Sequence, residues 1–430
     1  MGAAVPRRPL PQIGAAAPPP FRLPGSHFAA ALGWLGVAAV LLPALAARLA
    51  DGRVFEPPVL ALVHVVALGV VGSTIFGALY QFVPGGLGVP LRSVRAGLAG
   101  FWALQSGVAT LVAGLWWWSG PLQLTGWFLL LAAVGAVSVN VLQARRRSVQ
   151  GKQIGLYLSV AHSALGFGMA IAFARIGETL GWWHVGRLGL LAAHALLGLV
   201  GFGTLTAVGV GSRMLTTFLQ APGDDRRPLT GLLCLASGAL GVFGVGIVFG
   251  WELVAQLGGV LLVATGIGVS ALGVRWFRRR GRALDPALWH VVGAFAALVG
   301  ATLLGAGLLV GGPTDLARWA ALVVAALCGW LVLLVVGVMA KIVSHLSYIN
   351  LFSRMPGFAA IGDPNLLLRA DWLAASGACL TAGALGLTAA IDLGSAQVAR
   401  MAALLWSAGV AITLANFFRM LVVGRRGPRP

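Results

Sequence analysis

Long hydrophobic stretches follow one another along the whole chain and are separated by short polar connections. A stretch of about 18 or more apolar residues is long enough to cross a bilayer as a helix. The pattern predicts twelve such spans, at 28–48, 58–82, 96–118, 121–143, 154–176, 187–211, 229–250, 254–277, 287–311, 317–340, 370–391 and 397–421. We therefore expect an all-α, polytopic membrane protein whose main partner is the lipid bilayer.

Composition supports the class of membrane proteins. The net positive charge could suggest a nucleic-acid-binding protein, but the positions of the charges give another explanation. Only 10% of the 430 residues are charged, against about 25% in soluble domains. The net charge is +19, but Lys and Arg cluster after every second span, as in 145–152 and 275–282, and the connection between spans 3 and 4 has none. Cytoplasmic loops concentrate Lys and Arg. The charge therefore predicts a multi-pass protein of the inner (cytoplasmic) membrane with both termini cytoplasmic, and we expect no nucleic-acid partner.

The ends of the chain and the cysteines complete the expected organisation. Residues 1–26 are rich in proline and arginine and predict a disordered cytoplasmic tail, and 425–430 form a basic cytoplasmic tail. Between them, 27–424 form one transmembrane domain. Cys234, Cys328 and Cys379 are scattered through apolar spans. Their spacing matches neither a zinc site nor a covalent haem attachment, so we interpret them as packing residues.

Three spans end in similar phrases, GALYQFVP in span 2, GVGSRMLTTF in span 6 and GVMAKIVSHL in span 10. In each phrase a glycine precedes a long polar side chain by four residues, and the glycines are 132 and 128 residues apart; the pairs are Gly77 and Gln81, Gly209 and Arg213, and Gly337 and Lys341. This recurrence predicts three parallel four-helix units, about 27–150, 151–284 and 285–424, with pseudo-threefold symmetry about the membrane normal. The three polar side chains are expected to snorkel to the inner surface.

The histidines form two layers. Four of them lie towards the inner side, without an assigned role: His27, His162, His290 and His345. His184 lies in an outer connection, whereas His64 and His194 lie roughly 10 Å inside the outer ends of spans 2 and 6, in the phrases HVVALGVVG and HALLGLVGFG.

An imidazole in the bilayer core is costly unless it has a partner or a ligand. Imidazole nitrogen is a good axial ligand of haem iron, and neighbouring glycines leave room for a flat macrocycle. His64 and His194 are therefore the candidate cofactor-binding and metal-ligating residues, with haem b as the cofactor. The alternative is that each histidine bonds to a neighbouring helix.

Three four-helix units with histidines in spans 2 and 6 resemble the haem-copper oxidase subunit I superfamily. The phrases HVVALGVVGSTIFGALYQFVP and HALLGLVGFGTLTAVGVGSRML look more like its small NnrS-type and oxidase-subunit-I-like relatives, which are linked to haem and nitric oxide. The resemblance covers 27–424 and implies that His64 matches the low-spin haem ligand and His194 the position of a copper ligand.

The chain also departs from the superfamily pattern. Gly198 stands where an oxidase has a tyrosine, span 7 lacks the adjacent histidine pair, and span 10 has no histidine. We therefore expect no complete copper site, no terminal oxidase activity and, if the protein is an enzyme, an oxidoreductase-like haem protein. The second ligand of a haem on His64 would be His194, Met339 or an open position.

The expected function is electron transfer, gas sensing or a nitric-oxide response, with a possible respiratory electron-transfer partner. A membrane transporter or a non-catalytic assembly subunit remains the alternative. Transport sites often contain buried carboxylates, and every acidic residue here falls at or near the end of a span.

Overall fold

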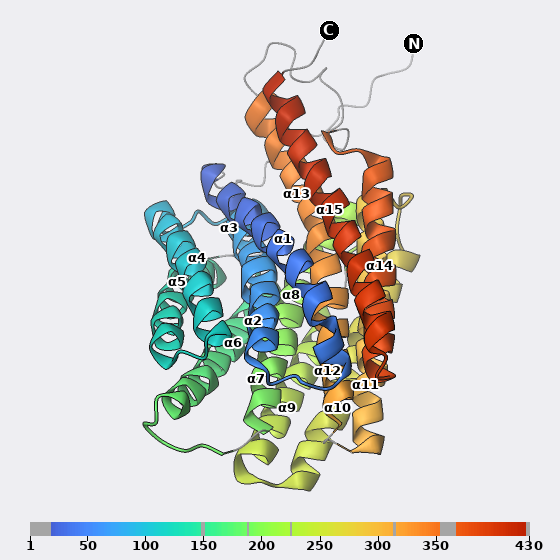
Figure 1. Ribbon diagram of the computed structural model, residues 1–430. Coiled ribbons are helices and arrows are strands. Elements are labelled where there is room, and N and C mark those ends of the chain that lie inside the picture. Colours follow the sequence, from blue (N-terminus) through green and yellow to red (C-terminus); the bar gives the residue numbers. More distant parts are fainter. Residues whose placement is uncertain are drawn as a thin grey trace, which may run out of the picture.

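The computed structural model describes residues 19–147, 151–186, 189–223, 226–312, 315–352 and 367–426, and every regular element within them is a helix (Figure 1). Twelve helical runs in this part of the chain are long and apolar enough to cross a membrane. The predicted all-α membrane protein with twelve spans is confirmed at this level.

Nine of the twelve runs are continuous α-helices: α1 (Arg22–Ala50), α4 (Val94–Trp116), α5 (Gly120–Arg147), α6 (Lys152–Thr179), α9 (Arg226–Phe249), α10 (Glu252–Arg278), α11 (Pro286–Gly311), α14 (Ala370–Asp392) and α15 (Ala396–Arg426). Helix α1 begins five residues before the predicted end of the tail, so residues 22–26 are helical. Pro24 lies in the first turn, where proline is tolerated because that N–H has no partner within the helix. Residues 1–18 of the predicted tail and 427–430 lie outside the described residues.

The other three runs each change from α-helix to π-helix and back. Span 2 consists of α2 (Pro57–His64), η1 (Val65–Gly72) and α3 (Ser73–Leu87), span 6 of α7 (Gly189–Leu196), η2 (Leu197–Thr204) and α8 (Leu205–Leu219), and span 10 of α12 (Leu316–Val324), η3 (Ala325–Leu331) and α13 (Val332–Phe352). A π-helix is rare, and its usual single-turn form is frequent at functional sites. The π-helical segments of these three spans are therefore candidates for a functional site.

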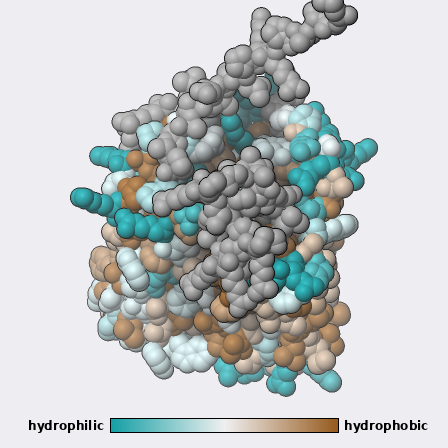
Figure 2. Space-filling model, turned by 90° about the horizontal axis from the view of Figure 1, so that it is seen from above, coloured by the Kyte–Doolittle hydropathy of each residue, from teal (hydrophilic) through white to brown (hydrophobic). Residues whose placement is uncertain are grey.

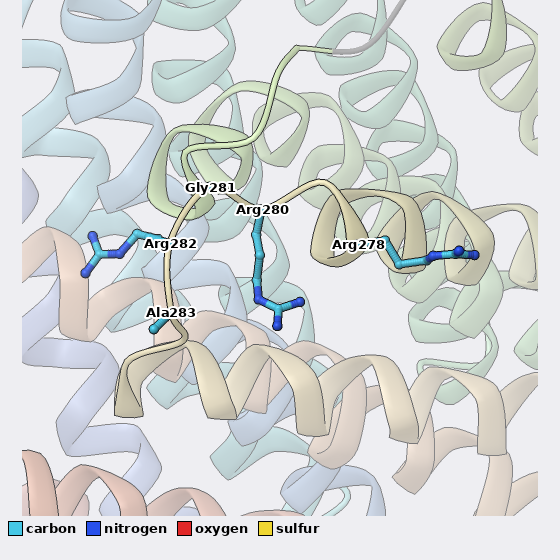
Figure 3. A pocket seen from close by; sticks show the side chains of 5 residues that line it. All are labelled: Arg278, Arg280, Gly281, Arg282 and Ala283. Atoms are coloured by element: carbon cyan, nitrogen blue, oxygen red, sulfur yellow. The ribbon is translucent and has the colours of Figure 1, made fainter.

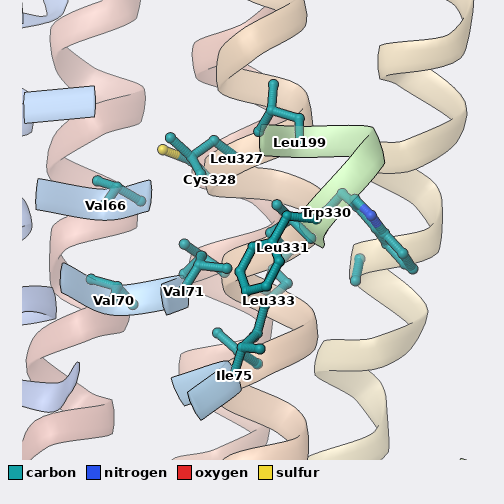
Figure 4. Packing of buried hydrophobic residues seen from close by; sticks show 14 of the residues in the cluster. Val66, Val70, Val71, Ile75, Leu199, Leu327, Cys328, Trp330, Leu331 and Leu333 are labelled. Carbon is teal, nitrogen blue, oxygen red and sulfur yellow. The ribbon is translucent and has the colours of Figure 1, made fainter. Parts of the chain in front are cut away.

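Spans 2, 6 and 10 form the centre of the protein. More than half of the residues in the apolar window of each are buried, whereas the windows of the other described spans are at most half buried. Their π-helical segments pack into one hydrophobic cluster, in which Val71 of η1 lies close to Leu331 of η3 (Figure 4). At the same level, the Trp330 indole donates a 3.0 Å hydrogen bond to the Thr204 hydroxyl and joins η3 to η2.

Each central span carries two glycines, eight residues apart, that contact the helix preceding it in the chain. A Cβ added at any of them would lie within 3.0 Å of a neighbouring atom. The contacts are Gly69 with Trp34, Gly77 with His27, Gly201 with Ala164, Gly209 with Tyr157, Gly329 with Ala297, and Gly337 with His290 and the Ala287 carbonyl. Small residues let transmembrane backbones approach closely. Gly77 and Gly337 each contact a histidine of the preceding helix, whereas Gly209 contacts Tyr157.

The start of α1 and the end of α15 lie at one face of the bundle (Figure 1). Seen from that face, hydrophilic side chains lie around the rim (Figure 2). All described acidic residues lie in or next to the terminal turns of helices, as expected: Asp51, Glu56, Glu178, Glu252, Asp285, Asp315, Asp371 and Asp392. Asp224, Asp225 and Asp363 lie outside the described residues. Within the described part of the spans there is no mid-membrane carboxylate of the kind that proton-coupled transport uses.

Candidate functional site

The two histidines predicted as ligands lie where spans 2 and 6 change their helix type. His64 is the last residue of α2, and η1 begins directly after it. His194 is the third residue from the end of α7, just before η2. A π-helical turn contains more residues than an α-helical turn. It therefore changes the direction in which the side chains on either side of it point. Both rings are half-buried.

The structure brings these two imidazoles together. Their ring centroids are 6.2 Å apart and their planes are inclined by 27°. The two residues are 130 positions apart in the sequence, so the pairing depends on the tertiary fold. Further along the same two spans, α3 and α8 are in contact.

Both rings are oriented by backbone carbonyl groups. His64 Nδ1 lies 2.8 Å from the Leu60 oxygen, one turn earlier on α2. His194 Nδ1 lies 2.9 Å from the Gly168 oxygen on α6. A carbonyl oxygen only accepts, so each Nδ1 carries the proton and donates it, and each Nε2 is left with a lone pair. This is the tautomer in which imidazole binds a metal through Nε2.

The spacing of the rings suits one shared metal ion. Two imidazoles that bind one ion through Nε2 from opposite sides, each at about 2.0–2.1 Å, would have ring centres roughly 6 Å apart. The described residues contain no group of three or more His, Cys, Asp or Glu side chains that would hold a metal ion by itself. The donor set is therefore two neutral nitrogens, which suits a metal whose other ligands come from a bound group.

Two features of α6 that carry no sequence signal complete the site. The Gly168 carbonyl orients His194, and a Cβ built at Gly168 would be 3.9 Å from His194 Nδ1, an ordinary van der Waals contact. The next carbonyl, of Met169, accepts a 2.9 Å hydrogen bond from the Trp127 indole of α5. Every residue has a backbone carbonyl, so residue types do not identify the ones that accept a hydrogen bond from a ring. Hydropathy predicts where α6 lies in the sequence, but not which of its faces points towards His194.

The other described histidines do not join this pair. His184 is exposed and lies 3.3 Å from Glu178. His27 is fully buried against the rings of Phe76, Tyr80 and Phe101. His162 bonds to the Leu158 carbonyl and His290 to Ser376, while His345 is exposed at the inner end of α13.

The remaining candidates are also placed. Met339 is buried in a separate inner cluster with Phe28 and Ala287, so it is not the partner of His64. Lys341 does not snorkel. Its side chain is only 9% exposed and forms an ion pair with Asp285, because the N-terminus of α11 brings that carboxylate to it.

The sequence was compared with protein-family models and with curated proteins, and neither comparison found a match. The resemblance to the oxidase superfamily thus remains a hypothesis that rests on the residues quoted for it.

Proposed function

We propose that this protein binds a b-type haem in the outer part of its membrane domain, where His64 and His194 would hold it. The observation that carries the proposal is the pairing of the two imidazoles, whose ring centroids are 6.2 Å apart and whose Nδ1 atoms each bond to a backbone carbonyl. Two neutral imidazole nitrogens would be suitable ligands for a haem iron, whose remaining ligands come from the porphyrin. A copper ion, in contrast, usually takes further protein ligands, and none of the described residues supplies them.

A haem with two protein ligands changes its oxidation state without binding a substrate at the iron. This supports electron transfer over gas sensing, since a diatomic gas would first have to displace one histidine. The surrounding residues fix the tautomer and the orientation of the two imidazoles and provide an apolar environment. These properties would set the reduction potential of a haem bound there. The natural partner of such a centre is a respiratory electron-transfer protein or a membrane-soluble carrier.

We further propose that the spans form three four-helix units with pseudo-threefold symmetry. The starts of η1, η2 and η3 are 132 and 128 residues apart, the same spacings that separate Gly77, Gly209 and Gly337. Each central span also repeats the paired glycine contact with the preceding helix. In this arrangement Tyr157 corresponds to His27 and His290. In this proposal the basic helix ends are cytoplasmic, as in a multi-pass protein of the inner membrane. His64 and His194 then lie towards the opposite side of the membrane, about 8–11 Å from the starts of α2 and α7.

A spectrum of the purified protein tests the haem proposal. Full-length protein, expressed with ample haem, is expected to show reduced-minus-oxidised bands of a six-coordinate b-type haem and about one haem per chain in a pyridine haemochromogen assay. His64→Ala and His194→Ala are expected to lose this spectrum. His184→Ala is the matched control, because it removes an exposed histidine that is not part of the pair. A haem-free wild type under these conditions contradicts the proposal.

A further inference from the structure

A basic pocket lies away from the histidine pair, in the connection between α10 and α11. Arg278, Arg280 and Arg282 line an open hollow of about 420 Å³ at the surface, together with Gly281 and Ala283. Figure 3 shows Arg280 between the other two guanidinium groups, which extend to either side of the loop. The connection follows span 8, so it lies at the same face as the start of α1.

Contacts with the end of α8 hold the loop in place. The Gly281 N–H donates a 3.0 Å hydrogen bond to the Leu219 carbonyl. A Cβ at Gly281 would lie 2.8 Å from the Gln220 oxygen, so only glycine fits without a shift. The pocket is therefore built on a fixed backbone and not on a freely moving loop.

The pocket keeps an excess of positive charge. Arg282 pairs with Asp285 at 3.3 Å, but Asp285 is shared with Lys341. No described carboxylate lies within ion-pair distance of Arg278 or Arg280, and Arg280 instead donates to the Phe277 carbonyl at 2.8 Å. Among the described residues, Arg278 and Arg280 thus have no carboxylate partner, and guanidinium is well suited to phosphate.

An apolar stripe leads to the pocket along the outer surface of α10. Ile267, Ala271, Val274 and Arg278 are all exposed and follow the i, i+4, i+7, i+11 spacing of one helix face. Ile267 is 59% and Val274 56% exposed, and Trp289 at the start of α11 is 53% exposed. In a membrane this face contacts lipid, and it ends at the basic pocket.

We propose that this pocket binds the phosphate of an anionic phospholipid whose acyl chain lies along Ile267, Ala271 and Val274. Basic pockets at the cytoplasmic ends of transmembrane helices are suited to such headgroups. The shared chemistry is a phosphate between Arg278 and Arg280, and the apolar stripe favours a lipid over a free phosphate ion. The proposal does not depend on haem binding.

Lipid titration of the full-length protein tests this site. Protein purified in uncharged detergent is titrated with short-chain phosphatidylglycerol, short-chain phosphatidylcholine or inorganic phosphate, and thermal midpoints give the affinities. Phosphatidylglycerol is expected to stabilise the wild type in a saturable manner, and phosphatidylcholine is not. The double substitution Arg278→Gln and Arg280→Gln is expected to weaken phosphatidylglycerol binding by about 10- to 30-fold.

Two further variants distinguish binding at this particular pocket from a general attraction of the lipid to the positive charge of the same face. Arg92→Gln with Arg95→Gln removes two exposed arginines from the same face and is expected to change the affinity less than twofold. Gly281→Ala keeps every charge but displaces the loop, and is expected to weaken binding. Equal losses in the two double variants, or an unchanged Gly281→Ala protein, would overturn the proposed pocket. Inorganic phosphate binding as tightly as phosphatidylglycerol would overturn the lipid as the source of the anion.

Discussion

The contact between Gly201 and Ala164 provides a sharp test of the central packing. A Cβ added at Gly201 would lie 2.5 Å from the Ala164 Cβ, roughly 1 Å closer than ordinary van der Waals contact. Ala164 has no flexible side chain that can move aside, so η2 and α6 must separate. Overpacking of this kind costs about 1–3 kcal/mol. We therefore expect Gly201→Ala to lower the free energy of unfolding by about that amount.

Gly198 offers a matched control on the same π-helix. No atom lies within 4 Å of a Cβ built at Gly198, so Gly198→Ala should lose no stability. Both variants can be compared by thermal unfolding in detergent, monitored by circular dichroism. If Gly201→Ala is as stable as Gly198→Ala, the close approach of η2 to α6 is wrong.

The same substitution also connects packing with the proposed site. Ala164 lies one turn before Gly168 on α6, and the Gly168 carbonyl orients His194. A shift of α6 away from η2 would move that carbonyl from His194 Nδ1. We expect Gly201→Ala, unlike Gly198→Ala, to retain less haem on purification.

Two further substitutions test buried polar contacts. Trp330→Phe removes the donor to the buried Thr204 hydroxyl and should lower the free energy of unfolding by about 1 kcal/mol; an unchanged midpoint in detergent would contradict that bond. Asp285→Asn removes the carboxylate that pairs with Lys341, whose side chain is 9% exposed, and should cost about 2 kcal/mol because a mostly buried cation loses its charged partner. Asp371→Asn is the control, because it breaks an exposed ion pair with Arg369; it should leave the unfolding midpoint nearly unchanged. Equal effects of Asp285→Asn and Asp371→Asn would refute the distinction between the two ion pairs.

Hydropathy alone was sufficient to predict the number and approximate limits of the spans. Span 12, predicted at 397–421, is found from Ala396 to Val422. The hydropathy pattern ends span 10 at residue 340, but its last helix, α13, continues to Phe352, because serines and His345 lower the hydropathy without breaking the helix. The prolines and arginines of 1–26 predict a disordered tail, but residues 22–26 belong to α1, because Pro24 fits the first turn of that helix.

The histidine pair could be predicted in part. Equal depth in spans 2 and 6 identifies His64 and His194 as candidates, and the structure brings their ring centroids to 6.2 Å of each other. The π-helices could not be predicted, because a change in hydrogen-bond register leaves hydropathy unchanged. The carbonyls of Leu60 and Gly168 were missed for a similar reason, since every residue has a carbonyl and only the fold decides which one meets a ring.

The central claim is that one haem iron is bound by His64 and His194 together. Electron paramagnetic resonance of the oxidised, haem-loaded protein tests it most directly, since low-spin ferric haem with two histidine ligands has a distinctive signal. We predict this signal in the wild type and in His184→Ala, and its loss in both His64→Ala and His194→Ala. A low-spin signal that persists unchanged in either single variant would contradict the claim.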